Sequence, residues 1–284
     1  MPFSKTTSAS VIQEWTEAAP FWDKHRSLIS QMWSPVTQAL IAAAGITEGQ
    51  SILDVATGPG DPALTLAPIV GPTGQIIGID PVPAMVTAAR REATRLNFTN
   101  TRFEVAFADS LPFPDATFDS ALSRFGVMFF PSPVDGICEI LRVLKPAGKL
   151  ALAVWHLPAQ NPFFRVVENI LDRYISPNAS NPDAPNSFRF APPGKLLNIL
   201  KEAGVATPTE ELLRFTMTVP GTLEDFWALR CEMSDKLRGL LATLAPLQLA
   251  EVKHQSLQAA RACGSANSLA FPAEVLILNG KKPA

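Results

Sequence analysis

Residues 52–60, ILDVATGPG, limit the possible folds of this chain more strongly than any other segment. An apolar run that ends in an acidic residue is typical of a buried β-strand, and the two glycines that follow permit a tight turn. After this turn we expect Asp61 to be the N-cap and Pro62 the first residue of a helix. A strand, a glycine turn and a helix N-terminus form the first β–α unit of nucleotide-binding domains, because the free N–H groups there can face a ligand.

Apolar strand patterns alternate with helix patterns through the first half of the chain. Beyond helices at 10–44, the sequence predicts strands at 51–56, 75–80, 102–107, 118–123 and 149–155 and helices at 61–70, 83–96 and 134–144. Strands that are apolar on both faces and alternate with helices favour a parallel sheet covered on both sides. We therefore expect an α/β, Rossmann-like, doubly wound sheet.

The pattern changes after residue 156. The later segments are a proline-rich stretch at 157–193 with one helix at 162–175, a helix at 194–203, a strand at 212–219, a long helical stretch at 222–262 and a last strand at 273–280. We expect an N-terminal helical cap at 1–45 and a main domain at 46–284. Within that domain, 157–193 and 222–262 are expected to be lid or insertion segments.

Composition argues against several classes of protein. The chain has 24 Lys and Arg against 26 Asp and Glu, so no basic field for nucleic acid is expected. No apolar run approaches the ~20 residues that span a bilayer, and the polar start resembles no signal peptide. The three cysteines, Cys138, Cys231 and Cys263, lie far apart and form no metal-binding pair. We expect no metal, no stable membrane insertion and a cytoplasmic location.

Asp80 ends the second predicted strand about 20 residues after the glycine turn, where an acidic side chain can accept both hydroxyls of a ribose. Its alternative role is to cap the helix predicted at 83–96. The spacing Gly58-x-Gly60-x-x-Ala63 also fits the dinucleotide fingerprint, so a nicotinamide-dependent oxidoreductase stays open at this point.

Four segments together carry a family resemblance. They are ILDVATGPGD, IIGIDPVPAMVTAAR, FEVAFADSLPFPDATFDSALSRFGVMFF and EILRVLKPAGKLALAVW. The chain resembles the class I S-adenosylmethionine-dependent methyltransferases, in particular the small-molecule group that includes the ubiquinone/menaquinone biosynthesis C-methyltransferases. The resemblance covers roughly residues 48–156. It implies S-adenosylmethionine as cofactor and a seven-stranded sheet of order 3-2-1-4-5-7-6 with an antiparallel last strand, in which 222–262 is a helical insertion before that strand.

The resemblance also implies a role for each matching position. These positions are Asp54, Ala56, Thr57, Gly58 and Gly60 for the methionine part, Asp80 for the ribose, Pro81, Met85, Asp109 and Ser110 for the adenine, and Arg124 and Phe125 beside the sulfonium. Ala56 departs from the glycine that is common at the start of the motif.

Methyl transfer from a sulfonium releases a neutral thioether, so the leaving group needs no acid. A base is needed only when the acceptor must lose a proton. His156 is a candidate because it follows the fifth strand at the edge where ligands bind, although it also fits a loop cap. His25 could approach the same place from the N-terminal helices.

Aromatic residues gather near the predicted site. Trp22 lies in the N-terminal helices, Phe129 follows the fourth strand and Trp155 ends the fifth. We expect them to line an apolar acceptor pocket, although such residues equally suit a core. The resemblance implies methyl transfer to a small, largely apolar molecule such as a quinone, polyketide, terpenoid or phenol, by a monomer or homodimer. The alternatives are a cofactor-binding protein without methyl transfer and the oxidoreductase.

Overall fold

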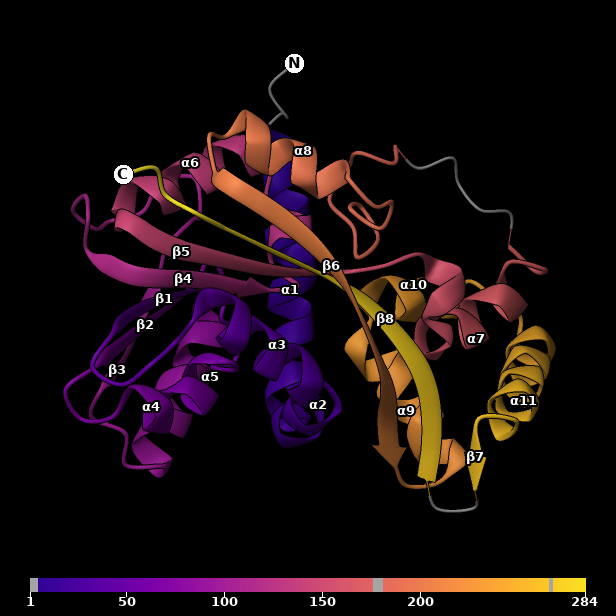
Figure 1. Ribbon diagram of the computed structural model, residues 1–284. Helices are drawn as coiled ribbons and strands as arrows, with labels where there is room; N and C mark the ends of the chain where they lie inside the picture. Colours follow the sequence, from indigo (N-terminus) through magenta and orange to yellow (C-terminus); the bar gives the residue numbers. More distant parts are fainter. Residues whose placement is uncertain (1–4, 176–180, 266–267) are drawn as a thin grey trace.

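The computed structural model describes residues 5–175, 181–265 and 268–284, which form one mixed sheet with helices on both faces (Figure 1). The strands are β1 (Ser51–Val55), β2 (Gln75–Asp80), β3 (Thr101–Val105), β4 (Phe118–Arg124), β5 (Leu144–Trp155), β6 (Ala206–Pro220), β7 (Gly264–Ser265) and β8 (Ser268–Lys281). The helices are α1 (Lys5–Lys24), α2 (Arg26–Met32), α3 (Ser34–Ala44), α4 (Ala63–Val70), α5 (Pro83–Arg95), α6 (Pro133–Val143), α7 (Pro162–Leu171), α8 (Lys195–Glu202), α9 (Leu223–Met233), α10 (Asp235–Ala242) and α11 (Pro246–Arg261).

The order of the strands is β3-β2-β1-β4-β5-β8-β6. The first five pair in parallel, and β8 is antiparallel to both β5 and β6. This confirms the predicted order 3-2-1-4-5-7-6 with its antiparallel last strand between the fifth and the sixth. The two-residue strand β7, which pairs with β8, was not predicted.

Helices α3, α4 and α5 lie on one side of the sheet, and α6 and α8 lie on the other (Figure 1). Residues such as Ile52, Leu53 and Ile76 are fully buried because the parallel strands are covered on both faces. Helix α3 packs against β4, β5 and β8. The end of the segment expected as a cap is therefore part of the α/β core, while the domain boundary after residue 45 stays a prediction.

Strands β6 and β8 extend beyond the rest of the sheet. β5 pairs with β8 only from Val275 to Lys281, whereas β6 pairs with β8 along its whole length, from Ser268 onward. Residues 214–220 and 268–274 thus form a two-stranded projection, here called the distal ribbon. Helices α7, α9, α10 and α11 lie beside it (Figure 1). The predicted helical stretch at 222–262 is therefore three helices.

Both strands of this ladder are longer than the sequence predicted. The first half of β6 reads ATPTEE, which is polar because β6 is an edge strand with one exposed face. The start of β8 contains Pro272, which argues against a strand but is tolerated opposite Thr216 in the ladder. Helix α7 ends at Leu171, four residues before its predicted end.

Candidate functional site

Two strained residues lie at the carboxyl edge of the sheet. Ala56 follows β1 with a φ of 60°, and Phe125 follows β4 with a φ of 65°. β1 and β4 are neighbours, so these left-handed residues stand side by side at the ends of adjacent strands. Residues other than glycine rarely adopt this backbone conformation because it is strained. Such strain concentrates at binding and catalytic sites.

Gly126 makes room for Ala56. A Cβ atom built on Gly126 would lie 2.5 Å from Cβ of Ala56 and 2.6 Å from Oγ of Ser123. Ala56 stands where the family motif commonly has glycine, and a glycine on the neighbouring strand end accommodates the extra methyl group. This compensation between two distant parts of the chain had no signal in the sequence.

The two glycines of the turn after β1 have different surroundings. A Cβ atom built on Gly58, at φ +54°, would meet nothing within 4 Å, so its backbone faces open space. At Gly60, with φ +107°, a Cβ atom would lie 2.8 Å from Cδ1 of Leu64 and 3.1 Å from Cβ of Ala89. Gly58 therefore lets a ligand approach the backbone, and Gly60 lets the turn pack on α5.

Asp54 is fully buried at the end of β1. Its Oδ2 accepts hydrogen bonds from Oγ1 of Thr57 (2.6 Å) and from the backbone N–H of Ala63 (3.1 Å), the first residue of α4. The prediction that Asp61 is the N-cap and Pro62 the first residue of this helix was therefore wrong, because the helix begins at Ala63 and the Asp54 carboxylate takes the N–H of that residue. Within the described chain Oδ1 of Asp54 has no hydrogen-bond partner. Burial raises the pKa of Asp54 to about 7.

Asp80 joins the glycine turn to the start of α5. Its Oδ2 accepts from the backbone N–H of Gly58 at 3.0 Å, and its Oδ1 accepts from that of Val82 at 2.9 Å. The carboxylate thus supports local backbone, and each oxygen keeps a lone pair for a further donor such as a ribose hydroxyl. Burial raises the pKa of Asp80 to about 6.

Arg124 ends β4 in a buried polar network. Its Nη1 donates to Oγ1 of Thr37 at 2.7 Å, and its Nη2 lies 2.6 Å from Oδ2 of Asp61 and donates to the Asp61 carbonyl at 3.1 Å. The guanidinium also lies over the ring of Trp33, 5.4 Å from its centroid. Through these contacts Arg124 connects α3 and the N-terminal helices to the glycine turn, while its place beside the sulfonium stays a prediction.

The residues expected around the adenine are divided between two environments. Met85 is buried and packs with Val82 against Ala19 of α1, so the N-terminal helix covers this part of the edge. Asp109 and Ser110 are exposed on the segment after β3. The structure therefore brings the glycine turn and Asp80 together, while the adenine contacts of Met85, Asp109 and Ser110 stay predictions.

Aromatic rings form a continuous chain along the same edge. The members of this ring cluster are Trp15, Trp22, Trp33, Phe125, Phe129, Trp155 and Phe164. Phe125 and Trp155 stack with their centroids 4.2 Å apart and an angle of 5° between their planes. Trp33 makes T-shaped contacts with both rings, with centroid distances of 5.1 Å to Phe125 and 5.9 Å to Trp155.

The three residues expected to line an acceptor pocket all belong to the ring cluster. Trp15 contacts Trp22 at 5.2 Å and Phe129 at 5.0 Å, while Trp22 reaches Trp155 through Trp33. Rings from the N-terminal helices and from two strand ends therefore form one apolar body. Their role toward an acceptor stays a prediction.

Comparisons with known proteins identify the family. A family model described as a methyltransferase domain matches residues 46–177. A demethylmenaquinone methyltransferase of Deinococcus radiodurans is 35% identical over 179 residues, which are 60% of this chain and 73% of that protein. The chain belongs to the class I S-adenosylmethionine-dependent methyltransferases.

Other relatives of this methyltransferase match a smaller share of the two sequences, or resemble it only in fold. A ubiquinone/menaquinone biosynthesis C-methyltransferase of Geobacter sulfurreducens is 36% identical over 121 residues, which are 42% of this chain and only 47% of that protein. The solved structure of the [4+2]-cyclase SpnF has a TM-score of 0.53 and 20% identity, over 94% of this chain and 95% of that chain. At that identity the likeness shows the fold alone.

In the described parts of the chain, no helix is both long and apolar enough to cross a bilayer.

The two candidate bases of this methyltransferase have separate acidic partners. His156 Nδ1 lies 2.6 Å from Oε2 of Glu274 on β8, and Oε1 of that carboxylate accepts from Arg214 at 2.9 Å. His25 pairs through Nε2 with Glu232 on α9. The sequence did not single out either glutamate, because each lies more than 100 residues from its histidine. The structure does not bring the two histidines to a shared partner.

The raised pKa values of Asp54 and Asp80 predict that the ligand-free methyltransferase loses stability as the pH rises. The folded protein holds these protons more tightly than the unfolded chain, so the stabilisation is complete below about pH 4 and is lost as the pH rises through 6 and 7. We expect the free energy of unfolding to fall by roughly 2 to 4 kcal/mol between about pH 5 and pH 8, as measured by urea unfolding.

The control for this pH dependence is Asp54→Asn. Its amide oxygen still accepts from Thr57 and Ala63, and its NH2 group takes the place of the unpartnered Oδ1. We expect a flatter pH profile in this variant. Equal stability of the unmodified protein at both pH values would contradict the prediction.

Proposed function

We propose that this methyltransferase transfers a methyl group from S-adenosylmethionine to a small, largely apolar acceptor. The observation that carries the proposal is the ring cluster, which lies beside the glycine turn: Phe125 belongs to the cluster, and the next residue, Gly126, packs against Ala56 at the start of the turn. An apolar wall next to the reacting methyl group suits an aromatic or unsaturated acceptor. A quinone, polyketide, terpenoid or phenol fits this description, and the quinone biosynthesis relatives support the same class.

The residues at the turn fit the cofactor. The open backbone at Gly58 admits the methionine part, and the unpartnered Oδ1 of Asp54 suits its ammonium group. Asp80 keeps acceptor capacity for the ribose hydroxyls. The cofactor supplies the electrophilic methyl group. The protein positions the acceptor against it and keeps water out of an apolar site, which accounts for much of the rate enhancement in such reactions.

An acceptor that loses a proton needs a base, and we propose His156 for this role. The carboxylate of Glu274 on Nδ1 favours the tautomer with its proton on Nδ1, which leaves Nε2 free to accept a proton. His25 pairs with Glu232 through Nε2 in the same way, and it is the second candidate because it does not follow a strand at the edge where ligands bind.

The decisive experiment combines binding and turnover. We expect the purified protein to bind S-adenosylmethionine and S-adenosylhomocysteine in the micromolar range and NADPH not at all, as measured by calorimetry. With a panel of quinones, phenols, polyketides and terpenoids, we expect S-adenosylhomocysteine to form with at least one compound. For a hydroxylated acceptor, His156→Gln should lower turnover and leave cofactor affinity unchanged.

A second candidate is a protein that binds the cofactor and does not transfer its methyl group. This candidate stays open because the chain shares its fold with a [4+2]-cyclase, and one fold can host unrelated reactions. Tight cofactor binding without consumption by any acceptor in the panel would support this candidate. Binding of NADPH in place of S-adenosylmethionine and S-adenosylhomocysteine would contradict both candidates.

A further inference from the structure

The turn that carries Asp109 and Ser110 has little structure of its own. The N–H of Ser110 donates to the carbonyl of Phe107 at 3.2 Å, which closes a tight turn just after β3. Ala108 packs against the core, and the N–H of Ala106 donates to the carbonyl of Asp80 at 3.3 Å, but Phe107, Asp109 and Ser110 are exposed. The two residues that would read the adenine therefore make few packing contacts of their own, and the segment that follows them helps to set their position.

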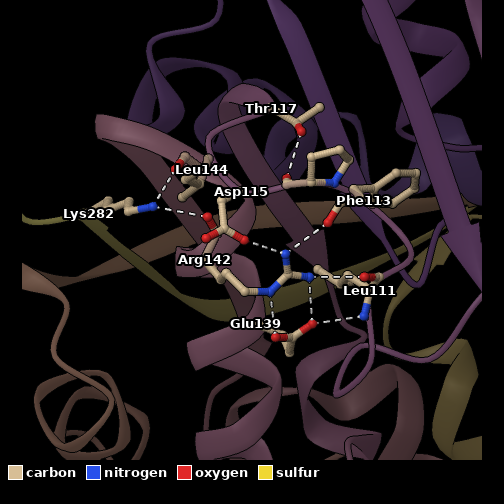
Figure 2. A network of polar contacts seen from close by, with 9 residues as sticks. Leu111, Phe113, Asp115, Thr117, Glu139, Arg142, Leu144 and Lys282 are labelled. Atoms are coloured by element: carbon tan, nitrogen blue, oxygen red, sulfur yellow. Dashed lines mark hydrogen bonds and ion pairs between the residues drawn. The ribbon is translucent and has the colours of Figure 1, made fainter.

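Two charged residues one turn apart on α6 hold that following segment. Glu139 accepts the backbone N–H of Leu111 at 2.9 Å, and Nη2 of Arg142 donates to the carbonyl of Leu111 at 3.0 Å. Both polar backbone groups of the residue directly after Ser110 are thus bound. Nη1 of Arg142 also donates to the carbonyl of Phe113 at 2.8 Å and to Oδ1 of Asp115 at 2.8 Å (Figure 2).

The two residues also fix each other. Nε and Nη2 of Arg142 donate to Oε1 and Oε2 of Glu139, at 2.7 Å and 2.9 Å, in a two-pronged pair (Figure 2). This pairing raises the pKa of Arg142 and lowers that of Glu139, so both stay charged across the physiological range. A planar guanidinium held in this way presents its remaining N–H groups in fixed directions.

The C-terminal end of α6 is held in place by Lys282, which lies 140 residues after Arg142. Nζ of Lys282 donates to the carbonyls of Arg142 and Leu144, at 3.0 Å and 2.7 Å, where α6 ends and β5 begins (Figure 2). The N–H of Thr117 donates to the carbonyl of Val143 at 2.7 Å. The end of α6 is therefore tied both to the residue that follows β8 and to the end of the segment that Arg142 holds.

We propose that Arg142 and Glu139 form a clamp that holds the turn of Asp109 and Ser110 where it reads the adenine ring of the cofactor. Arg142 is a positioning residue in this proposal, because it touches the segment and not the cofactor. The inference rests on the proposed function and on the adenine contacts that the family resemblance implies for Asp109 and Ser110. It adds a determinant of cofactor recognition that lies on a helix outside the cofactor site.

The test compares the binding of two ligands to each variant by calorimetry. The ligands are S-adenosylhomocysteine and its N6,N6-dimethyladenine analogue. The analogue lacks the exocyclic N–H groups from which Asp109 would accept a hydrogen bond. The unmodified protein should favour the natural ligand by roughly 10-fold. In Arg142→Met the natural ligand should bind roughly 10-fold more weakly, and the preference should fall toward one. Arg142→Lys, which keeps the positive charge but lacks the planar guanidinium that bonds both carbonyls, should keep an intermediate preference.

The matched control is Arg165→Met. Arg165 lies on α7 with 31% of its side chain exposed, against 32% for Arg142, and also pairs with a glutamate three residues away. It should leave both affinities unchanged. Asp109→Ala should abolish the preference, and adding Arg142→Met to it should have no further effect on the preference. A preference that persists in Arg142→Met would overturn the clamp, even if affinity or melting temperature falls.

The outcomes separate this proposal from the proposed function. No preference in the unmodified protein would overturn the clamp together with the adenine contact of Asp109, while methyl transfer could still be measured. No binding of S-adenosylhomocysteine at all would overturn the proposed function itself.

Discussion

Asp80→Asn is expected to weaken the binding of S-adenosylhomocysteine by roughly 100-fold, because two hydrogen bonds from ribose hydroxyls to a carboxylate are lost or weakened. In the unmodified protein the carboxylate accepts hydrogen bonds from the backbone N–H groups of Gly58 and Val82. In the variant, the NH2 group of the amide faces one of these two donors, so one hydrogen bond is lost. Calorimetry with the 2′-deoxyribose analogue separates the two effects. The unmodified protein should prefer the natural ribose by about 10-fold, and the variant should not.

Asp119→Asn is the matched control for this prediction. Asp119 also accepts a backbone N–H, that of Ser51 at 2.8 Å, and it pairs with Lys145, but it lies near the starts of β1 and β4. This is the edge of the sheet opposite the glycine turn. We expect lower stability without a change in cofactor affinity. Unchanged affinity and preference in Asp80→Asn would remove Asp80 from the site.

Arg124→Met is expected to destabilise the protein by roughly 3 to 5 kcal/mol and to lower its melting temperature by about 10 °C. The side chains of Arg124 and Asp61 are 4% and 9% exposed, so the substitution leaves a buried carboxylate without its cation. It also removes a positive charge that lowers the pKa of the buried Asp54, so the loss of stability at alkaline pH should become steeper.

Two further variants test the origin of this effect. Adding Asp61→Asn to Arg124→Met should restore part of the stability, because the unpaired charge is removed. Arg102→Met, in which the arginine of an exposed ion pair with Glu104 is removed, should cost no more than about 1 kcal/mol. If the two arginine variants lose equal stability, the buried network is not the cause.

The sequence predicted the α/β architecture well because its signals are local. The run before Asp54, the glycines of the turn and the apolar strands each specify their own conformation, and the family segments supplied the strand order. The polar half of β6 was missed because an edge strand shows no apolar run. Asp61 was misassigned as a helix cap because nothing local reveals that Asp54, nine residues before Ala63, takes its N–H group.

The sequence predicted the site residues that lie in local motifs, but it did not predict the distant residues with which some of them pair. Asp54, Gly58 and Asp80 lie in motifs with fixed spacing, and the structure brings them together. Their cross-chain partners had no such signal. Thr37 contacts Arg124 across 87 positions and Glu274 contacts His156 across 118, so both pairings depend on how the sheet places its strands and helices.

The position of β8 also sets the order in which the sheet can be assembled during synthesis. β6 leaves the ribosome before β8, but in the described sheet its only neighbour is β8, which lies between it and β5. Until β8 emerges, the edge of β5 and the whole of β6 present unpaired N–H and C=O groups to other nascent chains. Completion of the sheet therefore waits for a late, long-range pairing, which is slow and exposes the intermediate to aggregation.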